Sequence, residues 1–405
     1  MRIYSAASEE TLRASKLLAD WAGEGFLTQE QYQRLKRETV SELRTTNIFL
    51  RLILFLFTLI SVCAAAALFL TVFVPHSWEQ TNGIFLVIFA AVSYAAAELA
   101  ASRGRLYRYG IEEALAVGSV GFLCVGMEFA LFSGHPLLTA SDAAHSLVPA
   151  AGAVFSLWIW RRFGLWYAFP AAMIFTIFLS GYWTQSDAAQ RAIIAVFFVV
   201  GLICVAALRT RHRFDYLDDT YSLAEAFLWL GIYLAINLKL SPSNLPAGWW
   251  GWGGSAVAVS EYTRWFYWTT WVLIWVLPPV VLVRGIRLKD RFVIAAGAIA
   301  AVLTLVSNKP YLGWPRHTWD PMLLGILLTG VAWFLRRWLG RGPGGIRAGF
   351  TAARLSGKDK QWMSASSAVL GLVTPQSITP SPQTTSPEVR FGGGASGGGG
   401  AGGDY

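Results

Sequence analysis

Ten apolar stretches, separated by charged or turn-rich breaks, constrain the fold of this 405-residue chain. Each is about as long as the ~20 residues that a helix needs to cross the hydrocarbon of a bilayer. We expect helices near residues 48–74, 83–101, 111–133, 144–160, 165–182, 190–208, 220–239, 264–283, 291–307 and 320–335. With 55% hydrophobic and only 14% charged residues, the chain carries more apolar surface than an ordinary soluble core buries. The sequence therefore predicts an all-α, polytopic membrane protein with about ten transmembrane helices.

Basic residues indicate which connections stay in the cytoplasm. Arginine and lysine gather in alternate connections, at residues 103–108, 161–162, 209–213 and 284–291. The stretches 75–82 and 134–144 contain neither residue type. By the positive-inside rule both termini are expected in the cytoplasm, which agrees with an even number of crossings. About 47 polar and amphipathic residues precede the first apolar segment, so we expect no cleaved secretory signal.

The chain divides into three parts by composition. Residues 1–47 are expected to form a cytoplasmic helical hairpin, and residues 48–335 the transmembrane helix bundle. Residues 336–405 are expected to be a mostly disordered cytoplasmic tail, because they are rich in Gly, Ser and Pro and have too little apolar surface to offset the entropy of ordering. Within this tail, residues 347–355 are expected to form a short helix on the membrane surface.

Two amphipathic helices are predicted before the first apolar segment. Ser8 is expected to start the first, and Thr28 the second, with Gln31 completing a capping box. A pair this short buries little surface alone, so we expect it to pack on a second copy or on another membrane subunit. The residues expected to carry this interaction are Leu18, Trp21, Phe26, Tyr32 and Leu35.

The run Leu17 to Gln31, LLADWAGEGFLTQEQ, followed by a polytopic region, resembles the domain-of-unknown-function 2157 family of predicted bacterial membrane proteins. The hairpin is also similar to the short C-terminal (SHOCT) type of helical domain, in which a Gly, an apolar pair and Ser or Thr precede an acidic helix start. The first resemblance implies the bacterial inner membrane, several spans and no established activity. The second implies oligomerisation or interaction, and neither implies catalytic residues.

Four carboxylates lie in or beside the apolar segments and are candidates for proton or ion coupling, because ionisable groups in a span are costly to bury. Glu98, Glu113 and Glu225 fall near cytoplasmic ends, where they are expected to approach one another. Glu128 lies deep in the third segment, toward its outer end. The structural alternative makes Glu113 a partner of the helix dipole and of the arginines at 105 and 108.

Four of the five histidines are predicted on the outer side, at His76, His135, His145 and His317. Together with Glu128 they are weak candidates for a metal site or a proton-accepting cluster. No pair of them has a recognised ligand spacing, so independent histidines are the favoured interpretation and no metal or cofactor is expected.

Prolines and small residues suggest details of helix packing. Pro170 and the pair Pro278 and Pro279 are expected to kink or interrupt their spans. Gly118 and Gly121 are expected to permit close helix contacts.

No sequence pattern for a phosphate loop, a nucleophile elbow or a zinc motif is present, so enzyme function has the least support. The net charge of +9 does not indicate a nucleic-acid partner, because the basic residues lie beside helix ends. We expect a non-enzymatic interaction or assembly component of a membrane complex, with the lipid bilayer as its surroundings. The first alternative is a proton-linked small-molecule transporter or channel, and the second a membrane enzyme with an outer-face metal site.

Overall fold

The computed structural model of the chain describes residues 2–23, 25–40, 42–73, 79–132, 143–184, 186–211, 218–240, 262–315, 317–342, 346–347 and 350–351. All of these belong to one compact unit, Met1–Ala352. The second unit, Ala353–Tyr405, holds most of the tail predicted to be disordered and lies outside the described residues.

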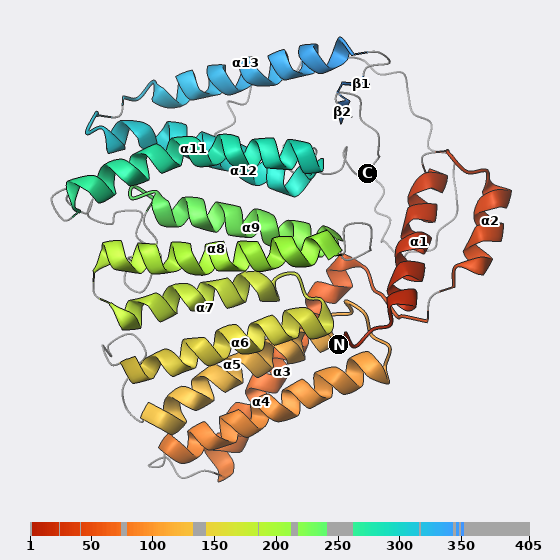
Figure 1. The fold of residues 1–405 in the computed structure, drawn as a ribbon. Coiled ribbons are helices and arrows are strands. Elements are labelled where there is room, and N and C mark those ends of the chain that lie inside the picture. Colours follow the sequence, from red (N-terminus) through yellow and green to blue (C-terminus); the bar gives the residue numbers. More distant parts are fainter. Residues whose placement is uncertain are drawn as a thin grey trace, which may run out of the picture. The chain divides into compact units, whose positions relative to one another are not determined.

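Helices occupy all ten predicted positions. They are α3 (Ile48–Phe73), α4 (Glu79–Ser102), α5 (Ile111–Phe132), α6 (Leu147–Phe163), α7 (Ala168–Trp183), α8 (Asp187–Arg211), α9 (Asp218–Ile236), α11 (Arg264–Leu288), α12 (Arg291–Tyr311) and α13 (Asp320–Gly340). A short 3₁₀ turn, η1 (Ala143–Ser146), leads into α6. Consecutive helices run in opposite directions (Figure 1). The predicted all-α class is therefore confirmed for the described residues, apart from one two-residue strand pair.

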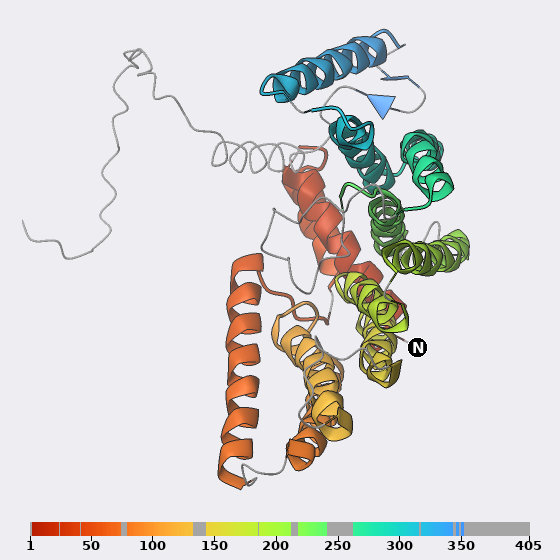
Figure 2. The ribbon, with the colours of Figure 1, turned by 90° about the vertical axis from the view of Figure 1, so that its left-hand side faces the viewer.

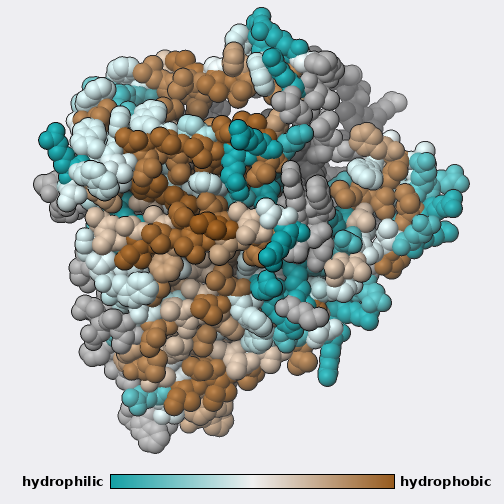
Figure 3. Space-filling model, in the orientation of Figure 1, coloured by the Kyte–Doolittle hydropathy of each residue, from teal (hydrophilic) through white to brown (hydrophobic). Residues whose placement is uncertain are grey.

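Within the described residues, seven helices are long and apolar enough to cross a membrane. They are α3, α4 from Gln80 onward, α5, α8, α11, α12 and α13. The helix α7 and the Thr220–Ile236 part of α9 are apolar but shorter. Figure 3 shows hydrophobic side chains over the middle of the bundle, with hydrophilic side chains gathered toward the end where the N-terminal helices lie. Surface of this kind is stable only against lipid, so the chain is a helical membrane protein.

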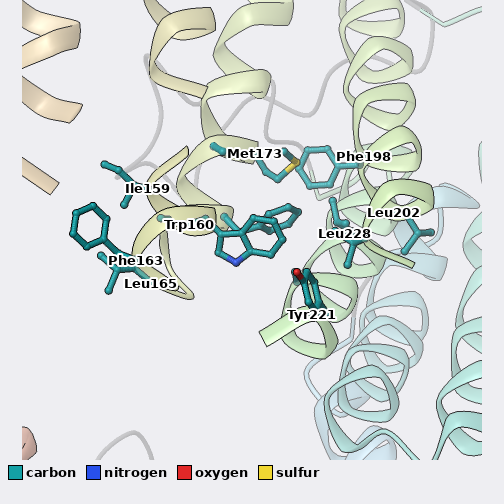
Figure 4. Packing of buried hydrophobic residues seen from close by; sticks show 14 of the residues in the cluster. Ile159, Trp160, Phe163, Leu165, Met173, Phe198, Leu202, Tyr221 and Leu228 are labelled. Atoms are coloured by element: carbon teal, nitrogen blue, oxygen red, sulfur yellow. The ribbon is translucent and has the colours of Figure 1, made fainter. Parts of the chain in front are cut away.

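The helices pack as antiparallel pairs in chain order. The pairs are α4 with α5, α6 with α7, α8 with α9, and α11 with α12; α5 also contacts α6, α7 contacts α8, and α9 contacts both α11 and α12. The largest cluster of buried apolar side chains extends from α4 to α9 and includes Tyr4; Figure 4 shows residues of its part on α6 to α9. There the ring of Trp160 lies 5.0 Å from that of Phe169 and 5.6 Å from that of Tyr221, measured between ring centroids.

Glycines bring α4 and α5 into backbone contact. A Cβ atom at Gly83 would lie 2.2 Å from the backbone nitrogen of Ala130, and one at Gly126 would lie 2.9 Å from the carbonyl oxygen of Gly83. No larger residue fits at either position without separating the helices. The close contact predicted at Gly121 is wrong, because a Cβ there meets no atom within 4 Å, and Gly118 meets only side chains at ordinary distances.

The helices α3 and α13 expose most of their apolar residues. Ala66 is the one buried residue of α3, and α13 has none among the described residues. Figure 2 shows α3, in orange, lying across the direction of the helices that are seen nearly end-on. Exposed apolar surface of this extent is expected to face lipid in a membrane protein.

The interruption predicted at Pro170 is wrong. Pro170 lies in the first turn of α7, because that helix begins at Ala168. The N–H that a proline lacks has no helical partner in a first turn, so Pro170 does not break a span. Pro278 and Pro279 do lie inside α11, which is helical on both sides of them.

The surface helix predicted at residues 347–355 is also not observed where the structure describes this segment. Ile346–Arg347 (β1) pairs antiparallel with Phe350–Thr351 (β2) instead. The helix before it, α13, continues to Gly340, past its predicted end at residue 335.

The N-terminal residues form the predicted helical hairpin, with α1 (Ala6–Gly23) packed on α2 (Gln29–Glu38). The capping box is confirmed, since the N–H of Gln31 donates to the Thr28 hydroxyl and the N–H of Thr28 donates to the Gln31 side chain. The start of α1 was predicted too late. The Ser5 hydroxyl caps the helix instead, because it accepts from the N–H of Ser8 at 3.1 Å.

Candidate functional site

The segment before α1 attaches the hairpin to one end of the bundle, which we call the hairpin end; the opposite end is the far end. The N–H of Ile3 donates to the carbonyl of Arg162 at the end of α6 (3.0 Å). The hydroxyl of Tyr4 donates to the carbonyl of Leu106 between α4 and α5 (2.7 Å). Both bonds join residues far apart in the chain, so they hold the hairpin against the bundle.

The segment after α2 makes a second attachment to the same loop. The N–H of Arg44 donates to the carbonyl of Arg105 (2.8 Å), and the N–H of Tyr107 donates to the carbonyl of Arg44 (3.0 Å). Burial raises the pKa of Tyr107 above its ordinary value. Burial, reinforced by the charge of Glu112, also raises the pKa of Tyr4. The attachment is therefore built around two neutral tyrosines, of which Tyr4 is buried and Tyr107 is half-buried.

The hairpin keeps an apolar surface exposed, formed by Leu17, Trp21 and Phe26, which we call the hairpin surface. These side chains are 43%, 48% and 70% exposed, respectively. Figure 3 shows hydrophobic side chains among hydrophilic ones over α1 and α2. Of the other predicted interaction residues, Leu18 is buried and Tyr32 and Leu35 are half-buried, so they stabilise the hairpin itself.

Glu113 binds an arginine from another helix. Its carboxylate accepts two hydrogen bonds from the guanidinium of Arg51 on α3. Gly110, just before α5, allows the backbone of α3 to approach closely enough for this contact. Its φ is +106°, and a Cβ there would lie 2.3 Å from the carbonyl oxygen of Arg51. The partners predicted for Glu113 at residues 105 and 108 are wrong, and Arg105 instead pairs with Glu42 (2.7 Å).

Glu225 lies at the centre of a larger charged network at the hairpin end. It accepts hydrogen bonds from Nη1 of Arg209 on α8 (2.8 Å) and from Nε of Arg284 on α11 (2.5 Å). Arg209 also pairs with Asp290 (2.6 Å), which caps the first turn of α12 and accepts from the hydroxyl of Ser222. One network thereby ties α8, α9, α11 and α12 together.

Glu98 binds a different arginine, Arg162 on α6, whose Nε donates to the carboxylate at 2.7 Å. The Tyr94 hydroxyl donates to the same oxygen at 3.0 Å. Glu98, Glu113 and Glu225 therefore bind separate arginines from neighbouring helices. A guanidinium at hydrogen-bond distance stabilises the ionised carboxylate, so these three contacts serve helix packing. Their role in proton or ion coupling stays a prediction.

Glu128 differs from the other three carboxylates. It lies near the far end of α5, and its Oε1 is 3.3 Å from Nδ1 of His145 in η1. Glu128 is 8% exposed and His145 is 4% exposed. The His145 ring stacks on Phe132, with ring centroids 3.9 Å apart, and on Tyr182 at 6.3 Å. The structure thus brings together two of the predicted candidates from separate elements.

The other histidines do not join this pair in the described part of the chain. His76 and His135 lie outside the described residues. His317 stacks on Trp319 beside the ion pair of Lys309 with Asp320 (2.5 Å). His317, Lys309 and Asp320 border an apolar pocket of about 590 Å³ between α12 and α13. Among the residues described, no three His, Cys, Asp or Glu side chains are close enough to hold a metal ion.

A polar network at the far end was missed by sequence reasoning. The buried amide of Asn237 donates to the hydroxyls of Tyr233 (2.9 Å) and Ser307 (2.8 Å), and Tyr233 in turn hydrogen-bonds Thr304. Tyr233 and Asn237 are four positions apart, which places them on one face of a helix. This spacing is the sequence feature that could have predicted their hydrogen bond. This network joins α9 to α12 by hydrogen bonds inside an apolar bundle.

Arg191 of α8 makes a related contact. It is almost fully buried and donates to Asp187 (2.7 Å) and to the carbonyls of Ala235 and Asn237 (3.3 Å each). It thereby binds carbonyl groups at the end of α9, where a cation opposes the negative end of the helix dipole. Tyr262 donates to Asp187, and burial followed by this bond raises the pKa of Tyr262 to about 12.

Comparisons with protein-family models, with curated proteins and with solved structures find no match to this chain. The class of the protein therefore follows from its fold alone: a bundle of antiparallel apolar helices with a helical hairpin attached at one end. The resemblance of residues 17–31 to the bacterial families stays a prediction.

Proposed function

We propose that the chain is a multi-pass protein of the bacterial inner membrane, with all ten helices crossing and both termini cytoplasmic. The alternating helix directions support this proposal, and so do the arginine-rich connections at the hairpin end. The shorter α6, α7 and α9 are packed among longer helices and are crossings in this proposal.

Within that membrane, the protein acts as a non-enzymatic interaction or assembly component, either as a homo-oligomer or with other membrane subunits. The observation that carries this proposal is the hairpin surface. Leu17, Trp21 and Phe26 are exposed, although the hairpin is attached to the bundle at both of its ends. An aromatic patch on a rigidly attached element, outside the apolar belt, is typical of a protein interface.

The transporter alternative has less support from the geometry. Three of its four candidate carboxylates form ion pairs with arginines of other helices, which is an arrangement typical of helix packing. The metal-enzyme alternative has no group of three ligands within the described residues.

Native mass spectrometry of the full chain in mild detergent tests the assembly proposal. We expect the wild-type protein to retain a second copy or another membrane subunit, and Trp21→Ala to lose it without a change in thermal stability. Trp166→Ala is the matched control, because Trp166 is a similarly exposed tryptophan (46%) that belongs to the connection between α6 and α7 and not to the hairpin. The proposal is wrong if the wild type is a single chain, or if both variants behave alike.

A further inference from the structure

Glu128 and His145 are buried polar groups whose bonding needs explanation. Among the described residues, neither oxygen of Glu128 has a hydrogen-bond partner. The same is true of Nδ1 of His145. Buried polar atoms in folded proteins almost always have one. The two groups nevertheless face each other, with Oε1 and Nδ1 separated by 3.3 Å. A single proton on the line between these atoms would satisfy both of them.

Among the side chains that the structure describes, none near this pair is a cation that would stabilise a carboxylate. α5 packs on α3, α4 and α6, and η1 packs on α6 and α7. The other described charged side chains of these helices all lie near the hairpin end; they are Arg51, Glu98, Glu112, Glu113, Arg161 and Arg162. Glu113 is about 22 Å away along α5. The other ionisable groups nearby are Cys124, one turn back on α5, and Tyr182 on α7.

The apolar contacts of the pair decide which form of it is stable. Phe132 and Tyr182 cover the imidazole, and water has little access to either side chain. In such surroundings an ion pair is stable only when further hydrogen bonds satisfy both charges. The described residues supply none to the carboxylate, whereas a neutral acid donating to a neutral imidazole leaves no charge to solvate.

We propose that Glu128 and His145 form a proton-binding site at the far end of the bundle. In this site Glu128 carries the proton and donates it to Nδ1 of His145, whose Nε2 keeps its own hydrogen. Loss of the proton leaves a buried carboxylate facing a lone pair, which opposes the packing of η1 on α5. The bound proton therefore helps to hold η1 in place. This site does not depend on the assembly role of the hairpin.

Infrared difference spectroscopy of the full chain in lipid nanodiscs tests the site. The stretching band of a protonated carboxyl group is distinct from that of a carboxylate. We expect the wild type to show a hydrogen-bonded protonated band at neutral pH, and Glu128→Gln to lose it. Glu113→Gln is the matched control on the same helix; because Glu113 is paired with Arg51, this change should leave the band intact.

A second pair of variants tests the role of the imidazole. His145→Phe removes the acceptor and should move the band to the position of a free carboxylic acid, whereas His145→Gln retains an acceptor and should largely restore it. The proposal is overturned if the wild type has no protonated band, if the band survives in Glu128→Gln, or if His145→Phe leaves it unmoved.

Selective ¹⁵N labelling of histidine gives a measurement on the unaltered protein, should Glu128→Gln fail to fold. The His145 resonance, assigned by its absence in His145→Gln, should report a neutral imidazole with Nδ1 unprotonated. A doubly protonated imidazole would mean that the pair is an ion pair, which contradicts the proposal.

Discussion

Replacing Glu225 by glutamine removes one charge from the network at the hairpin end while keeping the size of the side chain. Among the described residues, two arginines, Arg209 and Arg284, face two carboxylates, Glu225 and Asp290, so the charges of these four side chains balance. After the substitution two cations face one anion. The side chain of Glu225 is 0% exposed and that of Asp290 is 2% exposed, so little water reaches the excess charge.

The expected loss follows from this burial. Removing one partner from a buried ion pair costs roughly 3–5 kcal/mol, mostly because the other charge is left buried and unpaired. Glutamine retains an oxygen that can accept from Arg209, and the side chain of Arg284 is 39% exposed. We therefore expect a loss of stability at the lower end of this range, about 3 kcal/mol. That corresponds to a change of about 100-fold in the equilibrium between folded and unfolded protein.

Glu98→Gln is the matched comparison. It also removes a carboxylate bound to an arginine at the hairpin end, but Glu98 and Arg162 are 33% and 24% exposed. Pairs with this much access to water contribute less than about 1 kcal/mol. The free energy of unfolding, measured by tryptophan fluorescence in mixed detergent micelles, should therefore fall about three times further for Glu225→Gln.

The double variant Glu225→Gln with Arg284→Gln restores neutrality and should recover part of the loss. Equal losses of stability in Glu225→Gln and Glu98→Gln would refute the argument from burial. A double variant less stable than Glu225→Gln would refute the argument from net charge.

Two further predictions concern packing and pH. Gly126→Ala should destabilise the protein by roughly 1–3 kcal/mol, since its Cβ would meet the backbone of α4. Gly121→Ala should be neutral or slightly stabilising, because a Cβ there meets no atom within 4 Å. Thermal unfolding of both variants checks this prediction, and equal effects would contradict it. Burial raises the pKa of Tyr4, so the stability from its bond to Leu106 should be present below the ordinary tyrosine pKa and fall as pH rises above it. Tyr4→Phe should cost about 1 kcal/mol at neutral pH and remove one late ionisation from the alkaline ultraviolet titration, and an unchanged titration would be the contrary result.

Most of the helical architecture was predictable from local pattern. Apolar length located all ten helices, and the residues Thr28 and Gln31 predicted a capping box that the structure confirms. These features depend on neighbours in the chain, which a sequence displays directly. The errors fell where local signals were ambiguous, as with Pro170 near a helix start and the two-residue strands at residues 346–351.

The partners of the polar residues were less accessible. The sequence indicated that Glu98, Glu113, Glu128 and Glu225 were unusual, but not that three of them bind arginines while the fourth faces His145. Nor did it indicate that Leu18 is buried while Trp21 is exposed on the same helix.

Length and apolar composition by themselves determined that this chain forms membrane helices, because the solvation of each segment depends on its own residues. Only the tertiary structure decided which charge meets which, since Arg51 and Glu113 are separated by 62 positions and Arg284 and Glu225 by 59. Such contacts depend on how the helices are rotated and how closely they approach, and glycines such as Gly83 and Gly110 control that approach through the absence of a side chain.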